Sequence, residues 1–254
     1  MKGDKSGKDL WESAWRESPL AKYYGIEKYL AINKKLDILF NKFLNKGDKR
    51  ILEIGCAKAK WLIHFAKEFG YDVYGIDYSE KGVELAKQNL IISRIKGTIL
   101  CEDIFQTSLV GESFDIVYSM GLIEHFDNPA EIIDKHIKLL KTGGKLIITV
   151  PNYRNSLYID LRKLIGSDKH ILETHNLSTM DKKVLDALSR NKGIKISFLD
   201  YFGPIDLALV FDHINSRPIL YLIHLINQMI GYGTFLMPSS KYFSPYLIMI
   251  GQKV

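Results

Sequence analysis

The sequence has little of what marks several classes of protein. It contains two cysteines in 254 residues, Cys56 and Cys101, which excludes a disulfide scaffold and favours a reducing compartment. The first ten residues are polar and charged, without the apolar core of a signal peptide, so we expect a cytoplasmic location. Hydrophobic residues make up 46% of the chain and charged residues 25%, a composition that excludes global disorder.

The charge balance is basic but evenly spread. The formal net charge is +6. Such a balance is compatible with nucleic acid, an anionic membrane or an anionic small molecule as partner. Because the lysines are scattered, we interpret them as solvated helix faces and expect no nucleic-acid partner. The oligomeric state stays open.

One segment lacks charge altogether. Between Pro218 and Ser240 there is no Asp, Glu, Lys or Arg. Within it, His224, Asn227 and Gln228 fall on one stripe of an otherwise apolar helix. We predict a helix that is buried in the protein or covers an apolar site. A helix on a membrane surface and a membrane span are the alternatives, which leaves transient contact with a membrane surface open.

Short apolar runs alternate with helix-like stretches from residue 50 onward. The runs cover residues 50–55, 71–77, 97–101, 114–119, 145–150, 194–201 and 246–252. Strands that alternate with helices predict a parallel sheet with right-handed crossovers. The sequence therefore indicates an α/β fold.

The first run ends in a turn of small residues. Gly55, Ala57 and Ala59 alternate in the segment Glu53–Ala59, just before a predicted helix. Small residues at a strand-to-helix turn let the backbone approach a nucleotide closely. The spacing differs from Gly-x-Gly-x-x-Gly, which disfavours an NAD-dependent dehydrogenase.

Acidic residues end the next two runs as well. Asp77 can accept hydrogen bonds from both hydroxyls of a ribose, and Asp103 can accept one from an adenine amino group. Because the carboxyl ends of parallel strands meet at one edge, we expect Glu53, Asp77 and Asp103 to define one crevice. The alternative is that Asp77 and Asp103 form helix caps or turns.

Five segments in this order resemble the class I S-adenosylmethionine-dependent methyltransferases, more narrowly their small-molecule branch known as type 11 or type 23. The matching residues are 51–56, 73–77, 101–105, 114–119 with 123–126, and 139–144, with 150–152 and, more loosely, 174–177. The resemblance covers about residues 50–155. It implies a Rossmann-like, seven-stranded, mostly parallel sheet with helices on both faces, an antiparallel last strand and a helical lid.

The resemblance also implies a cofactor, S-adenosylmethionine, with S-adenosylhomocysteine as product. The implied cofactor-binding residues are Glu53, Gly55, Cys56, Ala57, Asp77, Tyr78, Asp103, Ile104, Ser119 and Met120. Alanines stand at positions 57 and 59, where the family has glycines, and their methyl groups crowd the cofactor. A non-catalytic cofactor-binding or partner protein therefore stays as an alternative.

We predict a methyltransferase that acts on a small molecule by in-line transfer to an O, N or C nucleophile. The uncharged segment favours an acceptor with an apolar or lipid-like part, and a polar metabolite is the alternative acceptor. A nucleic-acid methyltransferase is the alternative. Methylases of exocyclic base nitrogens carry an Asn/Asp-Pro-Pro-aromatic loop where this chain has residues 119–122, Ser-Met-Gly-Leu. No group of His and acidic residues has the sequence spacing of metal ligands, so we expect no metal.

A hydroxyl acceptor needs a general base. His125, after the fourth run, is the first candidate and His175 the second. His125 can instead serve packing or capping, and His175 can instead be a surface residue. We expect a single domain over 1–254, with N-terminal helices in 1–46, a cofactor-binding core in 47–151, and lid insertions in 152–177 and 203–243. The candidate substrate-lining residues, each of which can also belong to the core, are Tyr23, Tyr24, Tyr153, Arg154, Tyr158, Phe211 and Tyr221.

Overall fold

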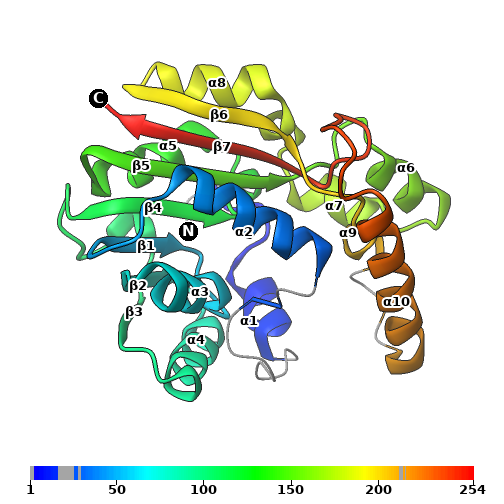
Figure 1. Ribbon diagram of the computed structural model, residues 1–254, viewed down its shortest axis with the longest axis horizontal. Coiled ribbons are helices and arrows are strands. Elements are labelled where there is room, and N and C mark those ends of the chain that lie inside the picture. The colour runs from blue at the N-terminus through cyan, green and yellow to red at the C-terminus, as the bar shows by residue number, and fades with distance from the viewer. Residues whose placement is uncertain (1–2, 17–25, 28–29, 212–213, 215) are drawn as a thin grey trace.

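The computed structural model describes residues 3–16, 26–27, 30–211, 214 and 216–254. A seven-stranded sheet in the order β3-β2-β1-β4-β5-β7-β6 forms its centre (Figure 1). The strands are β1 (Arg50–Ile54), β2 (Asp72–Asp77), β3 (Gly97–Cys101), β4 (Phe114–Met120), β5 (Leu140–Pro151), β6 (Ile194–Phe202) and β7 (Tyr246–Lys253). Strands β1 to β5 are parallel, and β7 is antiparallel to β5 and β6. The predicted fold class is confirmed.

Helices cover both faces of this sheet because the strands are apolar on both faces. In β1, Ile51 packs in one cluster with Phe40 and Phe65, whereas the next residue, Leu52, packs in another with Ile133. The helices that supply these clusters are α2 (Ala31–Phe43), α3 (Lys60–Phe69), α4 (Glu80–Ser93), α5 (Pro129–Leu139) and α8 (Lys182–Arg190). The two layers hold the carboxyl ends of β1, β2 and β4 in fixed positions.

Several helices begin at a side chain that caps them. Ser79 accepts a hydrogen bond from the Gly82 N–H at the start of α4. Asn128 does the same for Ala130 at the start of α5, with Pro129 in the first turn. These side chains satisfy backbone donors that have no partner within the helix.

The N-terminal segment is more ordered than the polar sequence suggests. Asp4 forms an antiparallel bridge with Phe126, and the Lys5 N–H donates to the His125 carbonyl at 2.7 Å. Helix α1 (Lys8–Arg16) follows this bridge. Its contact with α4 is close, since Glu12 accepts a hydrogen bond from the first backbone N–H of that helix. Residues 3–16 therefore form a strap across the carboxyl edge of the sheet.

The segment between β5 and β6 also holds more regular structure than its sequence suggests. It contains α6 (Leu157–Leu164), α7 (Lys169–Thr174) and a single 3-10 turn, η3 (Leu177–Met180). Another 3-10 turn, η2 (Ile123–His125), follows β4 and contacts η3. Strand pairing of β5 begins at Leu140, earlier than the run at 145–150 predicts.

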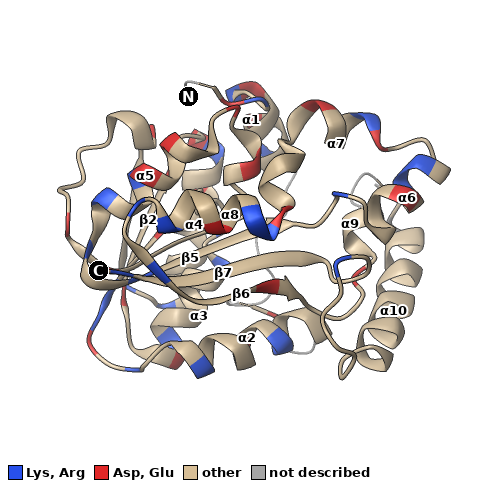
Figure 2. Cartoon of the chain, turned by 90° about the horizontal axis from the view of Figure 1, so that it is seen from above, with Lys and Arg blue, Asp and Glu red and all other residues tan. Residues whose placement is uncertain are grey.

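Helix α10 (Arg217–Gly233) forms one end of the molecule beside α9 (Ala208–Phe211) (Figures 1 and 2). Its polar stripe faces the protein: the Asn227 amide donates to Asp206 at 2.7 Å, and Gln228 accepts from the Ala31 N–H. The apolar face points outward, so the expectation of a buried helix is wrong for that face. In the described part of the chain, no helix combines the length and hydrophobicity needed to cross a bilayer.

Candidate active site

A cavity of about 330 Å³ lies at the carboxyl ends of β1, β2 and β4. Eight of the ten implied cofactor-binding residues line it: Glu53, Gly55, Cys56, Ala57, Asp77, Tyr78, Ile104 and Met120. Two lie outside its lining. Asp103 accepts a hydrogen bond from the Phe105 N–H and caps a short turn, and the buried Ser119 hydroxyl contacts Nε2 of His136 at 2.9 Å.

Asp77 is the best-defined polar group of this cavity. Its Oδ2 accepts a hydrogen bond from the Ala57 N–H at 3.0 Å, and its Oδ1 accepts one from the Ser79 N–H at 2.9 Å. Burial raises the pKa of Asp77, although these backbone donors oppose the shift. Because a carboxylate offers about four acceptor positions, Asp77 keeps capacity for a ligand hydroxyl beside its backbone donors.

The turn after β1 combines a glycine with an alanine in the left-handed region. Gly55 has φ of +77° and Ala59 has φ of +53°. The left-handed conformation costs an L-residue about 1 kcal/mol or more, and glycine avoids that cost. Ala59 is buried at the start of α3, so the tight packing of the turn holds it there.

The buried side chain of Glu53 fits a cationic ligand. Its side chain is 6% exposed and lines the cavity. Burial raises its pKa to about 8, despite the nearby Tyr118 hydroxyl. Among the described residues, Oε2 of Glu53 makes no hydrogen bond of ordinary geometry, nor does the Tyr118 hydroxyl. A sulfonium or ammonium group in the cavity would compensate this buried carboxylate.

The N-terminal strap closes the cavity on a side that the sequence did not assign. Asp4, Trp11 and Trp15 line it, and the Tyr78 hydroxyl donates to Asp4 at 2.5 Å. The two tryptophan rings stack with centroids 5.9 Å apart. Their four-residue spacing was visible in the sequence, but it does not show what they cover.

A second cavity, of about 490 Å³, adjoins the first. Trp11, Trp61, Met120, Gly121 and His125 line both. Most of the other lining side chains are aliphatic, aromatic or small and polar. They are Ser6, Leu10, Ala14, Ile32, Asn33, Leu36, Thr149, Pro151, Tyr153, His170, Ile171, Thr174, His175, Leu209 and Tyr246. The described lining contains no Asp, Glu, Lys or Arg.

One of the predicted substrate-lining residues reaches this second cavity. Tyr153 lines it, and its hydroxyl donates to the Leu209 carbonyl at 3.1 Å. Tyr23 and Tyr24 lie outside the described residues. From the insertion 203–243, Leu209 alone is part of the described lining, so that segment contributes less to the lid than predicted.

Four other predicted residues lie elsewhere in the fold. Arg154 forms an ion pair with Asp181 at 3.2 Å. Tyr158 is fully buried in the core, and Phe211 packs against the same core. Tyr221 is 67% exposed on the outer face of α10. Residue type and position along the chain did not show which way these aromatic side chains point.

The two candidate histidines lie together at the second cavity. The ring centroids of His125 and His175 are 4.5 Å apart. Burial lowers the pKa of His125 to about 4 and that of His175 to about 3, with the neighbouring His125 adding to the second shift. Both imidazoles are therefore neutral near pH 7, and both are weak bases.

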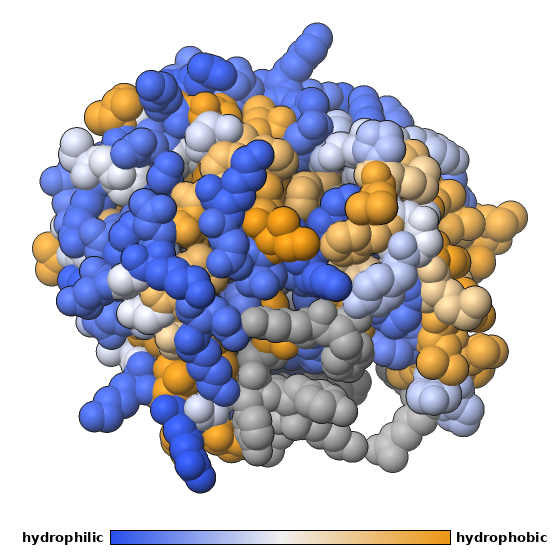
Figure 3. All heavy atoms as spheres, viewed as in Figure 1, coloured by the Kyte–Doolittle hydropathy of each residue, from blue (hydrophilic) through white to orange (hydrophobic). Residues whose placement is uncertain are grey.

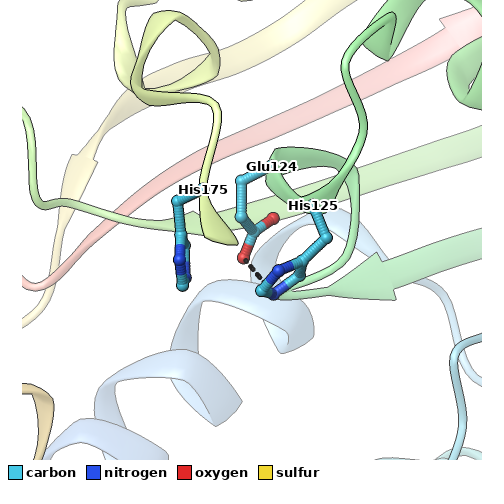
Figure 4. A group of neighbouring side chains, drawn as sticks. All are labelled: Glu124, His125 and His175. Carbon is cyan, nitrogen blue, oxygen red and sulfur yellow. Dashed lines mark ion pairs between the residues drawn. The ribbon is translucent and has the colours of Figure 1, made fainter. Parts of the chain in front are cut away.

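Glu124 completes this group (Figure 4). Its Oε1 lies 3.9 Å from Nε2 of His125, and burial raises its pKa to about 8. Within the described residues, Oε2 of Glu124 makes no hydrogen bond. Because His175 follows α7, far along the chain from Glu124 and His125, sequence spacing did not reveal this cluster.

Comparison with known proteins extends these observations. The ubiquinone biosynthesis O-methyltransferase of Coxiella burnetii is 28% identical over 160 residues, which are 63% of this chain and 63% of that protein. The chain thus matches somewhat less than two thirds of the length of this relative. Among solved structures, the phosphoethanolamine N-methyltransferase 2 of Haemonchus contortus, in complex with phosphomonomethylethanolamine and S-adenosylhomocysteine, is 17% identical with a TM-score of 0.61, over 96% of this chain and 56% of that one.

The [4+2]-cyclase SpnF has a TM-score of 0.63 at 15% identity, over 98% of this chain and 96% of that one. These structural similarities show the shared fold. The sequence profile of the family described as "Methyltransferase domain" matches residues 24–201, well over half of the chain. The chain therefore belongs to this methyltransferase family, as a class I member whose cofactor is S-adenosylmethionine.

Proposed function

We propose that the chain transfers the methyl group of S-adenosylmethionine to a small molecule held in the second cavity. One observation carries this proposal: the two cavities meet at Met120, Gly121 and His125, so a methyl donor in the first faces an acceptor in the second. Bringing two reactants into line is the main contribution a protein can make to such a transfer.

The residues around the first cavity fit the cofactor, which supplies an activated methyl group on a sulfonium. Asp77 would hold the ribose hydroxyls, and the buried Glu53 would face a cationic part of the methionyl group. Trp11 and Trp15 would exclude water from the reacting atoms. In this arrangement the protein orients the two substrates and removes solvent.

The second cavity favours an uncharged, partly apolar acceptor. Its described lining has no cationic side chain, which disfavours a phosphate-bearing acceptor such as that of the Haemonchus enzyme. Ile32, Leu36, Ile171 and Leu209 provide an aliphatic surface instead. This surface, together with the relation to ubiquinone O-methyltransferases, favours a phenolic or other hydroxyl-bearing acceptor with a lipid-like part.

A direct experiment tests this function. Calorimetric titration with S-adenosylhomocysteine measures the cofactor site, and transfer of labelled methyl from S-adenosylmethionine measures the reaction. We expect micromolar binding, and transfer to a polyprenylated phenol but not to phosphoethanolamine. Transfer to phosphoethanolamine would overturn the proposed acceptor class. Failure of the folded protein to bind the cofactor would overturn the proposed function as a whole.

The outer face of α10 supports a second part of the proposal, that the protein collects its acceptor at an anionic membrane surface. Large apolar side chains on and just after this helix are exposed, and Figure 3 shows them as the orange edge of the molecule. They are Ile219, Leu220, Tyr221, Leu222, Leu225, Ile226, Met229, Tyr232, Leu236 and Met237. This apolar face of α10 is of the kind that inserts into the headgroup region of a bilayer.

Charge next to this apolar face points to an anionic bilayer as its occupant. Lys34 of α2 lies 5.9 Å from the ring centroid of Tyr232, and Lys35 lies 5.6 Å from that of Phe235. Lysines beside an inserted apolar face attract acidic headgroups by about 1 kcal/mol each. A hydrophobic acceptor dissolved in the same bilayer would then be close to the protein.

Vesicle sedimentation tests this surface. We expect binding to phosphatidylglycerol-containing vesicles, weaker binding to phosphatidylcholine alone, and at least tenfold loss in the double variant Leu225→Glu, Met229→Glu. The matched control is Ile91→Glu, because Ile91 is 74% exposed on α4. Equal binding by all three proteins would refute the assignment. A change of mass in light scattering, without vesicle binding, would instead assign the face to a second copy of the chain.

A further inference from the structure

The cluster of Glu124, His125 and His175 has a chemical property that methyl transfer alone does not require. Each residue offers one potential metal-ligating atom, and the three atoms lie within 4.8 Å of one another. Figure 4 shows the Glu124 carboxylate between the two imidazole rings. Two neutral imidazoles and one carboxylate form a donor set that binds transition metals.

Hydrogen bonds to the other ring nitrogens fix which lone pairs are available. Nδ1 of His125 lies 3.0 Å from the Thr174 carbonyl oxygen and 2.8 Å from the Ser6 hydroxyl oxygen. Because the carbonyl can only accept, Nδ1 carries the proton and Ser6 acts as its second acceptor. Nδ1 of His175 lies 2.9 Å from Oγ1 of Thr174. That hydroxyl already donates to the His170 carbonyl, so it accepts from His175. In both rings Nε2 therefore keeps its lone pair, the arrangement that outer hydrogen bonds impose on metal-binding histidines.

One oxygen of the Glu124 carboxylate lacks a proton donor in this environment. Its side chain is 1% exposed, and its Oε2 has no hydrogen-bond partner within the described residues. A Cβ placed on Gly121 would lie 3.4 Å from Oε1 of Glu124, so the carboxylate borders the point where the two cavities meet. An unpartnered buried carboxylate among lone pairs is costly, and a cation removes that cost.

We propose that Glu124, His125 and His175 bind one divalent transition-metal ion, which holds a hydroxyl oxygen of the acceptor. The role of the ion in holding the acceptor rests on the proposed function. A set of two nitrogens and one oxygen favours Zn²⁺, Co²⁺, Mn²⁺ or Fe²⁺ over Mg²⁺ and Ca²⁺, which prefer oxygen alone.

The geometry suits a catalytic type of metal site. Metal–ligand bonds of about 2.0–2.2 Å place ligand atoms roughly 3–3.5 Å from one another, so the side chains need to close by up to roughly 1.5 Å. His125 and His175 both line the second cavity, so the remaining coordination positions open toward the acceptor. Three protein ligands with an open position distinguish catalytic from structural sites.

The ion would activate an acceptor hydroxyl in the second cavity. On coordination, the hydroxyl loses its proton to solvent, because the cation stabilises the resulting anion. An oxygen lone pair then forms the new O–CH₃ bond as the S–CH₃ bond breaks, and that electron pair returns to sulfur. The products are a methyl ether and the thioether S-adenosylhomocysteine, so atoms and charge balance.

Cobalt(II) alone is the probe for this site. Purified protein is stripped with a chelator, and Co²⁺ is added while visible absorption and calorimetric heat are recorded. We expect one equivalent to bind with micromolar or tighter affinity and to give the intensified visible bands of a site with fewer than six ligands. The spectrum needs no variant, so it tests the site even if a substituted protein does not fold.

Matched variants then assign the ligands. His175→Gln and Glu124→Gln are each expected to weaken Co²⁺ binding at least tenfold, whereas His224→Gln on α10 is expected to leave it unchanged. Absence of Co²⁺ binding to the wild type, or equal affinity in all four proteins, would overturn the proposal. Binding of S-adenosylhomocysteine in the same preparation separates this outcome from failure of the proposed function.

Discussion

The two cavities that meet at His125 are built in different ways. The cofactor cavity takes Glu53, Asp77 and Met120 from the ends of three strands of one sheet, each within or next to a recognisable sequence motif. The acceptor cavity gathers side chains from the N-terminal strap, α2 and the segment after β5. The first is fixed by strand register, and the second by contacts between segments that are distant in the sequence. Conclusions from sequence are therefore strong for the first and weak for the second.

The largest expected effect tests the cofactor side of this comparison. Asp77→Ala removes the anchor of the Ala57 and Ser79 backbone N–H groups and the two hydrogen bonds that we propose for the ribose hydroxyls. Losing two charge-assisted hydrogen bonds costs about 3 kcal/mol, so we expect about a 100-fold loss of S-adenosylhomocysteine affinity in calorimetry. Asp72→Ala, at the exposed opposite end of β2, is the control. Similar affinities in both variants would remove Asp77 from the site.

A smaller effect is expected at His136, which packs beneath the residues that line both cavities. His136 is fully buried, contacts Ser119, and has a pKa lowered to about 4 by burial. The unfolded chain, with a pKa of about 6.5, binds more protons in acid than the folded one, so stability falls as pH drops from about 6.5 toward 4.

Between pH 7 and pH 5 this one group is expected to cost about 2 kcal/mol of unfolding free energy. The difference is measured by urea denaturation of the wild type and His136→Gln at both pH values. His125 and His175 titrate in both proteins, so their contributions cancel. An identical pH dependence in the two proteins would show that His136 is protonated in the folded state as readily as in water.

Two tryptophans of the strap allow the contributions of the two cavities to binding to be separated. Trp11 lines both, and its ring stands edge-on to His125 with centroids 5.0 Å apart, whereas Trp15 lines the cofactor cavity. Truncation of an aromatic contact of this kind costs about 0.5–1.5 kcal/mol. We expect Trp11→Ala to weaken S-adenosylhomocysteine binding about tenfold and to raise the KM of the acceptor. Trp15→Ala should change cofactor binding alone, and a raised acceptor KM there would contradict the division.

The smallest expected effect concerns Ala59 at φ of +53°. Ala59→Gly relieves the left-handed conformation, partly offset by the greater freedom of glycine when unfolded, so we expect about 0.5 kcal/mol of stabilisation. Ala66→Gly, within helix α3, is the matched control and should destabilise by about 1 kcal/mol. Urea denaturation measures both. Destabilisation by both changes would show that the Ala59 methyl group packs better than its backbone suggests.

The sheet, its order and most of the cofactor cavity could be predicted because local signals carry them. Apolar runs, capping residues such as Ser79 and Asn128, and the turn after β1 each act within a few residues. The family resemblance then added the roles that geometry alone left open. Asp103 caps a turn outside the cofactor cavity. It shows the limit of such local signals, since an acid at a strand end can either bind a ligand or cap a turn.

The acceptor side was harder because it depends on which way side chains face. Tyr158 and Tyr221 are both aromatic residues of the predicted lid, yet one is fully buried in the core and the other is exposed. The pairing of Asp4 with Phe126 joins segments about half the chain apart, which no local pattern encodes. A separation of 51 residues likewise hid the approach of Glu124 to His175.

The strap also has a consequence for turnover. Hydrogen bonds join it to the segment after β4, to Tyr78 and to the start of α4, but no residue of α1 is buried. A segment that buries so little opens at lower free energy than the sheet beneath it. The cavity behind Trp11 and Trp15 can thus exchange spent cofactor for fresh through local unfolding, while the rest of the fold stays closed to solvent.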